Sequence, residues 1–245
     1  MITDAIPNME VIGHVCKTNL PSNTAFRGFG GPQTVLLAEM WLEKLSAAAG
    51  MHPEKMREAN LVKEGHITHY GMELKGVQAD ACWSSISGDL DARRADVDAF
   101  NVANRWRKRG IALTPVKFGI SFTATFLNQA GALVMIYRDG TVLVSHGGIE
   151  MGQGLHTKMC QVAATALGIT TDVVFVAETS TDKVPNASPS AASASSDLYG
   201  MAVLLAAREL EERLRPVRAK LGPEATFAAV VESAYFQQID LCAHG

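Results

Sequence analysis

Residues 19–33 combine side chains that suit ligand binding. Arg27 lies between Phe26 and Phe29 in a stretch with several glycines, and a helix is expected to begin at Pro32. The guanidinium carries a permanent charge and a planar set of donors, and the two rings can offer a flat apolar wall. This combination predicts a pocket for a group that is both anionic and aromatic. A glycine-rich turn in which Arg27 is only a structural clamp is the alternative.

A second candidate is the glycine-rich segment 147–154, which follows an expected strand and precedes an expected helix. Backbone N–H groups at the start of a helix lack partners and favour an anion such as a phosphate. The segment is no P-loop, because Gln153 stands where that motif has a lysine, and it does not match the G-x-G-x-x-G pattern. Glu150 is a candidate general base by type only, since the sequence does not define where its carboxylate points. A tight turn without a ligand is the alternative.

The third candidate, residues 188–197, consists of small and hydroxyl side chains before an expected long helix. Such residues let a large rigid ligand approach the backbone. The hydroxyl groups of Ser190, Ser193, Ser195 and Ser196 add hydrogen-bond donors. A serine- and proline-rich helix start with Asp197 in its first turn is the alternative.

Composition narrows the class of protein. The 245 residues are 47% hydrophobic and 19% charged, with a net charge of −3 and a pI of about 6.2. These values favour a folded domain and argue against a nucleic-acid partner, which needs a basic face. No apolar run approaches the ~20 residues of a bilayer span, and residues 1–10 lack the layout of a signal peptide, so we expect a cytoplasmic protein with no membrane partner. The four cysteines form no C-x-x-C pair, which argues against a zinc or iron–sulfur site held by this chain.

The elements that must position these segments follow from hydrophobic spacing. Helical spacing predicts helices at 33–49, 52–62, 83–109 (one helix or a pair), 155–167, from about 197 until Pro216 ends or kinks it, and 224–235. Alternation predicts strands at 10–17, 117–127 and 172–177, and Asp139-Gly140 predicts a hairpin joining 132–137 to 141–145. Helices come first, then strands, then mixed elements. This order favours an α+β fold over a doubly wound sheet.

Four segments occur in an order and spacing that resemble a known family. They are the arginine-containing segment, residues 118–123 (FGISFT), residues 152–158 (GQGLHTK) and residues 185–200. Together they resemble the molybdenum-binding domain of the xanthine dehydrogenase/oxidase family of molybdenum hydroxylases. The resemblance runs from about residue 7 to the last residue and is weakest at 80–110.

The resemblance implies an α+β fragment of the molybdenum-cofactor-binding domain, with mixed sheets and packed helices. It implies a first part at 1–114, with the arginine segment and helices. A second part at 115–245 holds strands, the glycine-rich segment and a long helix, and we expect it to be truncated at its C-terminus.

The resemblance also implies roles for individual residues around the substrate. Arg27 matches a catalytic arginine beside the molybdenum, whose fixed charge suits negative charge that develops on oxygen. Phe29 and Phe122 match two phenylalanines that sandwich a purine, and Thr123 matches a hydroxyl that orients it. Ala192 matches the backbone contact nearest the metal, so Arg27 and Ala192 are the residues expected next to molybdenum.

A second set matches residues around the pterin, held mostly through backbone and hydroxyl groups. Ser193 and Ser195 match positions that bind its phosphate region. The complete set of expected cofactor-binding residues is Phe26, Gly28, Met151, Gly152, Gln153, Ala191, Ser193 and Ser195.

The family's activity is hydroxylation of hypoxanthine and xanthine toward urate. A molybdenum-bound hydroxide attacks a ring carbon, and a hydride passes to a sulfido ligand. The resemblance therefore implies molybdenum-molybdopterin as cofactor and a purine as substrate. [2Fe-2S] and FAD are expected only on other domains or subunits, which would be this chain's partners.

The family's base glutamate lies in a Gly-Glu-Pro-Pro segment that does not occur here before Gly245. We therefore expect the isolated chain to be inactive. A non-catalytic truncated product, and a related molybdenum hydroxylase that acts on aldehydes or other heterocycles, are the alternatives.

Overall fold

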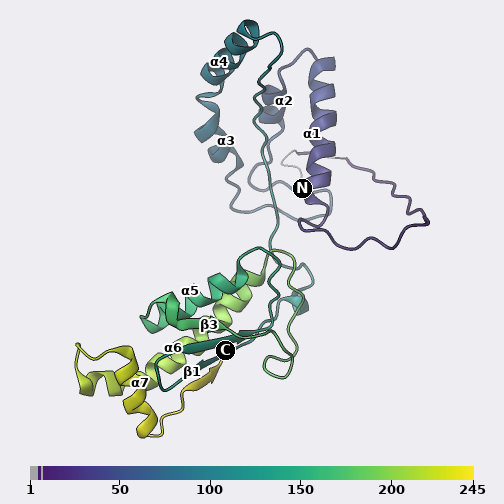
Figure 1. Ribbon diagram of the computed structural model, residues 1–245. Coiled ribbons are helices and arrows are strands. Elements are labelled where there is room, and N and C mark those ends of the chain that lie inside the picture. Colours follow the sequence, from purple (N-terminus) through teal and green to yellow (C-terminus); the bar gives the residue numbers. More distant parts are fainter. Residues whose placement is uncertain (1–4, 7) are drawn as a thin grey trace. The chain divides into compact units, whose positions relative to one another are not determined.

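The computed structural model describes residues 5, 6 and 8–245. The chain forms two compact units, Met1–Phe118 and Gly119–Gly245, and each is described by itself. Helices dominate the first unit, while the second combines three long helices with a small mixed sheet (Figure 1). The predicted α+β class is confirmed. The assignment of 1–114 and 115–245 as two parts of a cofactor-binding domain stays a prediction.

The described residues of the first unit form four helices, α1 (Gly31–Ala48), α2 (Pro53–Asn60), α3 (Ala79–Ser87) and α4 (Leu90–Ala103). Proline lies in the first turn of both α1 and α2, where a missing N–H costs nothing. The predictions at 33–49 and 52–62 are confirmed with shifted ends. The segment predicted at 83–109 is the pair α3 and α4, which begins at 79 and ends at 103.

A buried ion network holds these helices together. The side chain of Arg57 on α2 is 1% exposed, and its Nε donates to Glu39 Oε2 on α1 at 2.6 Å. Glu43 lies one turn further along α1, 3.5 Å from the same guanidinium. Glu54 on α2 pairs with Arg94 on α4 at 2.9 Å, so charged groups connect α2 to both neighbours.

The second unit is built around a four-stranded sheet. Its strands are β1 (Ala132–Ile136), β2 (Val142–His146), β3 (Val174–Val176) and β4 (Cys242–His244), in the order β3-β2-β1-β4. β1 pairs antiparallel with β2 and β4, and β2 pairs parallel with β3. The predicted hairpin is confirmed: Gly140 has φ 89° in the turn, and Asp139 accepts the N–H of Thr141 at 2.9 Å.

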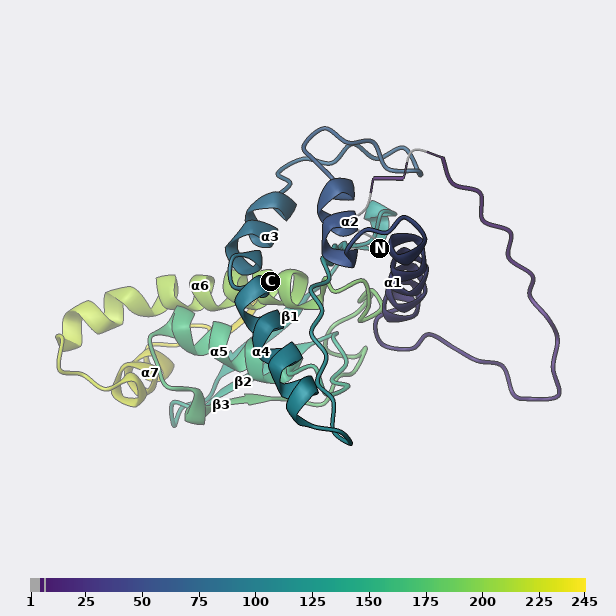
Figure 2. The ribbon, with the colours of Figure 1, turned by 90° about the horizontal axis from the view of Figure 1, so that it is seen from above.

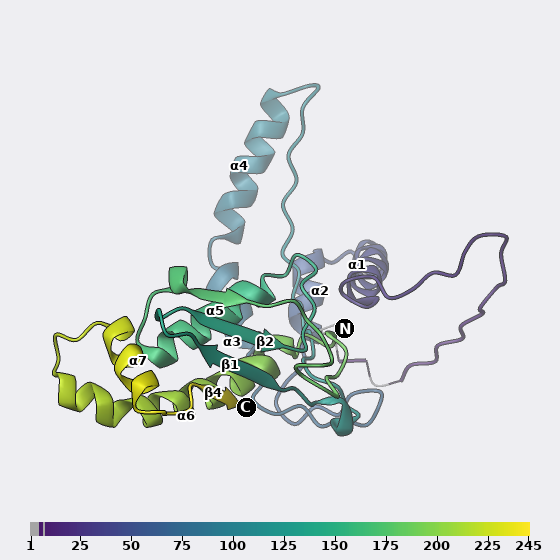
Figure 3. The same ribbon diagram turned by 60° about the horizontal axis from the view of Figure 1, so that its bottom comes forward.

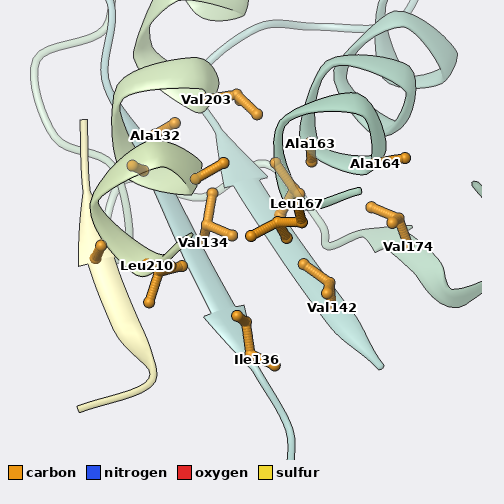
Figure 4. Packing of buried hydrophobic residues seen from close by; sticks show 14 of the residues in the cluster. Ala132, Val134, Ile136, Val142, Ala163, Ala164, Leu167, Val174, Val203 and Leu210 are labelled. Carbon is orange, nitrogen blue, oxygen red and sulfur yellow. The ribbon is translucent and has the colours of Figure 1, made fainter. Parts of the chain in front are cut away.

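Two helices pack on the sheet, α5 (Leu155–Leu167) and α6 (Ser195–Leu221), and α7 (Phe227–Phe236) packs against α6. α5 and α6 lie side by side, and both contact the strands (Figures 2 and 3). Alternate residues of β1, Val134 among them, are buried under side chains such as Leu167 of α5 and Leu210 of α6 (Figure 4). This apolar layer is the core of the unit, and it fixes the ends of β2, α5 and α6 where the candidate site lies.

Two strand predictions are wrong. Residues 10–17 are exposed and pair with no other strand. Residues 117–127 are irregular and end in the 3₁₀ helix η1 (Thr125–Leu127). The side chain of Asn128 bonds both the N–H and the C=O of Phe122, at 3.0 and 2.9 Å, which takes the groups a neighbouring strand would need. The alternation of apolar and small polar residues predicts a strand here, but it does not show whether a neighbouring strand is available to pair with it.

Other boundaries also differ from the prediction. The start of the strand predicted at 172–177 is the 3₁₀ helix η2 (Thr171–Val173). Pro216 does not end α6, because buried Leu214 and Val217 on either side hold the helix against the core. β4 was not predicted, and it pairs antiparallel with β1. No helix in the described part of the chain is long and apolar enough to cross a bilayer.

Candidate functional site

The glycine loop, residues 147–154, joins β2 to α5 and packs closely against the segment before α6. A Cβ placed on Gly147 would lie 2.1 Å from the Cβ of Ala187. One placed on Gly148 would lie 3.0 Å from the ring of Tyr199. Both spacings are below normal carbon–carbon contact, so Ala187 and the Tyr199 ring of α6 approach the backbone of the glycine loop this closely only because glycine has no side chain.

The serine loop, residues 185–196, is fixed by hydroxyl groups to the glycine loop on one side and to α6 on the other. Ser190 Oγ accepts the N–H of Ile149 at 2.7 Å. The Tyr199 hydroxyl donates to the C=O of Ser188 at 3.1 Å. Two of the segments singled out from the sequence therefore form one continuous structure.

A third segment joins them. The N–H of Ser121 donates to the C=O of Ala192 at 2.8 Å, which places residues 121–123 beside the serine loop. Phe122 is half-buried here and Thr123 is exposed. The segment that contains Phe122 and Thr123, two expected substrate-binding residues, thus lies next to Ala192, the residue expected nearest the metal.

Unusual backbone conformations gather at these contacts. Ser121, Ala192 and Ser193 have φ of 68°, 56° and 55°, in the left-handed region that residues with a side chain seldom occupy. Each costs about 1–2 kcal/mol, and such strain concentrates at functional sites. Phe29 in the first unit shows the same feature, with φ 46°. Neither the spacing nor the composition of the sequence signals these conformations.

Glu150 folds back onto the start of α5. Its carboxylate accepts the N–H groups of Gly152 at 2.8 Å, Gly154 at 3.0 Å and His156 at 3.1 Å. These backbone hydrogen bonds, the one from His156 foremost, lower the pKa of Glu150 to about 2. The expectation of unpaired N–H groups at the start of this helix is therefore wrong for His156, whose N–H already has a partner within the chain. A carboxylate so occupied is also a weak base.

Gln153 completes the internal bonding of the glycine loop. Its Oε1 accepts the N–H of Met151 at 2.7 Å, and its Nε2 donates to the C=O of Ile149 at 2.8 Å. The side chain of Met151 is 53% exposed, and Gly152 is exposed beside it. The loop is preorganised and presents Met151 and Gly152 outward.

Two histidines support the loop from behind. His146 is 1% exposed, and its Nδ1 accepts the N–H of Gly148 at 3.1 Å. Its Nε2 must then carry the proton and donate to Nδ1 of His156, 3.0 Å away. Burial lowers the pKa of His146 to about 4, with a smaller contribution from His156. A neutral His146 is consistent with a structural role for this ring.

Lys158 makes a polar contact with Ser196 that was not predicted from the sequence. Its Nζ lies 3.0 Å from Oγ of Ser196 and joins the first turns of α5 and α6. The sequence signals for it are its place at the end of the GQGLHTK motif and its position one turn into a helix that follows a glycine loop. The contact places a positive charge beside the serine loop.

The arginine segment belongs to the first unit. Arg27 is exposed, and Phe26 and Phe29 are 74% and 81% exposed, so the expected apolar wall is open to solvent there. The segment turns tightly, with the N–H of Phe29 donating to the C=O of Phe26 at 2.7 Å, and Gly28 has φ 99°. The grouping of Arg27 and these rings with the loops of the second unit stays a prediction.

Comparison with known protein families identifies the type of domain to which these segments belong. Residues 85–245 match the molybdopterin cofactor-binding domain family, and residues 5–61 match a second model of the same description. The chain belongs to the molybdopterin cofactor-binding domain family. Together with the identity to xanthine dehydrogenases given below, these matches confirm the resemblance to the xanthine dehydrogenase family and molybdenum-molybdopterin as the cofactor.

Among curated proteins, the chain is similar to several xanthine dehydrogenases. The chain is 55% identical to xanthine dehydrogenase 2 of Arabidopsis thaliana over 242 residues, and 54% identical to xanthine dehydrogenase of Oryza sativa subsp. japonica over 243. It is 50% identical to xanthine dehydrogenase/oxidase of Mus musculus over 242. In each case the match covers 98% of this chain and 18% of the relative, so the chain spans under a fifth of their length.

Solved structures share the fold of the family. Quinoline 2-oxidoreductase from Pseudomonas putida 86 matches with a TM-score of 0.69 and 19% identity, over 90% of this chain and 33% of that one. Aldehyde oxidoreductase from Desulfovibrio gigas matches with a TM-score of 0.66 and 20% identity, over 90% and 24%. At this identity the likeness shows the fold alone.

The second unit fits the family's cofactor in one respect that the structure makes visible. The backbone at Gly152, Ala191 and Ser193 is exposed and carries no bulky side chain. Residues this small leave room for a flat ligand to approach the backbone.

Proposed function

We propose that this chain provides part of the cofactor and substrate site of a cytoplasmic, molybdenum-dependent purine hydroxylase. The observation that carries the proposal is the convergence of the glycine loop, the serine loop and residues 121–123 in one unit. Sequence identities of 50–55% to xanthine dehydrogenases support the purine as substrate. Iron–sulfur and flavin groups would belong to other domains or subunits.

The chain's own residues would hold and orient the reactants. Ser193 and Ser195 would bind the phosphate region of the pterin, with Met151, Gly152, Gln153 and Ala191 around it, and Phe26 and Gly28 would add contacts from the arginine segment. The backbone of Ala192 would lie nearest the metal. When bound, the molybdenum group supplies the oxygen-transfer and two-electron chemistry.

Substrate would be held by aromatic rings and one hydroxyl. Phe29 and Phe122 would keep a purine flat by offset or edge-to-face contact, which suits a planar heterocycle. The Thr123 hydroxyl would fix its orientation by a hydrogen bond. Arg27 would stabilise negative charge that develops on the substrate oxygen, because its guanidinium stays charged at any working pH.

Elemental analysis tests the proposal. The chain is co-expressed with the remaining domains of a relative, and the purified assembly is assayed for molybdenum and for xanthine oxidation. We expect molybdenum in the assembly, with turnover that is absent from the isolated chain. An assembly that contains the chain but no molybdenum refutes the proposal.

A pair of substitutions tests the substrate contact. Phe122→Ala should raise the KM for xanthine by about tenfold, since an aromatic contact and its buried area are lost. Phe126→Ala is the matched control, because Phe126 lies nearby in sequence and is 70% exposed. Equal KM values for both variants would contradict a substrate role for Phe122.

A further inference from the structure

Glu150 fills a position at the start of α5 that an external anion would otherwise take. Free N–H groups at a helix N-terminus bind anions, because the helix dipole and the donors act together. In this chain the carboxylate of Glu150 accepts from Gly152, Gly154 and His156, so a negative charge is already present. A second anion there would meet repulsion from this carboxylate.

The neighbouring helix α6 lacks such a carboxylate cap. Its N-cap residue, Ala194, has no side chain that can accept a hydrogen bond from the first turn, and Asp197, which places a negative charge in that turn, does not cap it. Lys158 reaches across from α5 to Ser196 in that turn and adds a positive charge. Two adjacent helices therefore begin near the same loops, and Glu150 caps one of them.

We propose that Glu150 is a positioning residue, which keeps the anionic end of the cofactor away from α5 and directs it toward the serine loop. This rests on the proposed function for the identity of the cofactor. The exclusion of anions from α5 is a property of the chain alone. It needs no molybdenum, so it can be tested separately.

Amide exchange in the 245-residue chain tests the exclusion. In Glu150→Ala, exchange at Gly152, Gly154 and His156 should accelerate by about tenfold or more, because hydrogen bonds to a charged acceptor are lost. Inorganic phosphate should then slow exchange at these three amides again. In the wild-type chain phosphate should leave them unchanged.

Two further variants make the test specific. Asp139→Ala removes another carboxylate that accepts a backbone N–H, that of Thr141, in the hairpin turn. It should not create phosphate protection at the α5 amides. Glu150→Gln keeps the shape and one acceptor oxygen but removes the charge, and it should give phosphate protection weaker than that of Glu150→Ala. It also provides the test if the alanine variant fails to fold.

Separate outcomes identify which idea fails. Equal phosphate protection of these amides in wild type and variants, or none in any variant, overturns the role of Glu150. A purely structural role predicts lower stability without phosphate protection. Absence of molybdenum from the complemented assembly would instead refute the proposed function, while the phosphate result would still decide the exclusion of anions from α5.

Discussion

Replacing Gly147 by alanine should force the glycine and serine loops apart. The new Cβ would lie 2.1 Å from the Cβ of Ala187, and both atoms are fixed to the backbone, so no rotamer change can relieve the clash. Normal contact needs about 3.5–4.0 Å, and the loops must therefore separate by roughly 1.5 Å. Overpacking of this kind costs about 1–3 kcal/mol.

Separation would also break a hydrogen bond between the loops. The N–H of Ile149 and Ser190 Oγ are 2.7 Å apart, and losing this bond costs a further ~1 kcal/mol. We expect Gly147→Ala to lower the free energy of unfolding of the second unit by about 3 kcal/mol in total.

A compensating substitution isolates the cause. Ala187→Gly removes the atom that clashes and should by itself cost only about 1 kcal/mol, through greater backbone freedom. Combined with Gly147→Ala, it should restore most of the lost stability, so the pair shows a coupling of about 2 kcal/mol or more. Gly119→Ala is the matched control, because a Cβ at Gly119 meets nothing within 4 Å and its φ is not positive.

Native-state hydrogen exchange of β2 and α6 in low urea provides the assay. These elements belong to the second unit, so the measurement reports the part of the chain that contains the substitution. A Gly147→Ala variant as stable as Gly119→Ala, or a double variant no more stable than Gly147→Ala, would refute the close packing of the two loops.

Two other predictions concern buried charge. Burial lowers the pKa of His146 to about 4, whereas the ring in the unfolded chain takes up a proton below about pH 6.5. The contribution of the neutral ring to the free energy of unfolding is therefore complete above pH 6.5. It declines by up to ~3 kcal/mol as the pH falls to 4. Urea unfolding at several pH values should show this loss of stability at low pH in wild type and in His69→Gln, an exposed control, but not in His146→Gln. The same loss in His146→Gln would contradict the assignment of the effect to His146. Arg57→Met should destabilise the first unit by about 3 kcal/mol, because it leaves Glu39 without its buried partner. Tryptophan fluorescence follows this change, since all three tryptophans lie within residues 1–118, and an unchanged midpoint would count against the network.

Helices and tight turns could be predicted from the sequence because their causes are local. The apolar spacing of residues 155–167 and the Asp139-Gly140 turn each depend on a few neighbouring residues, and both predictions are confirmed. The strand predicted at 117–127 failed for the opposite reason. A strand needs a partner, and here Asn128 takes the backbone groups of Phe122.

For the candidate site too, some features could be predicted from the sequence and others could not. The order and spacing of four motifs determined the family, because residue types at fixed intervals can be compared without coordinates. The direction of the Glu150 carboxylate and the left-handed backbone at Ala192 were decided only by tertiary structure. Both depend on where β2, α5 and α6 end relative to one another, and the apolar layer between sheet and helices sets those positions.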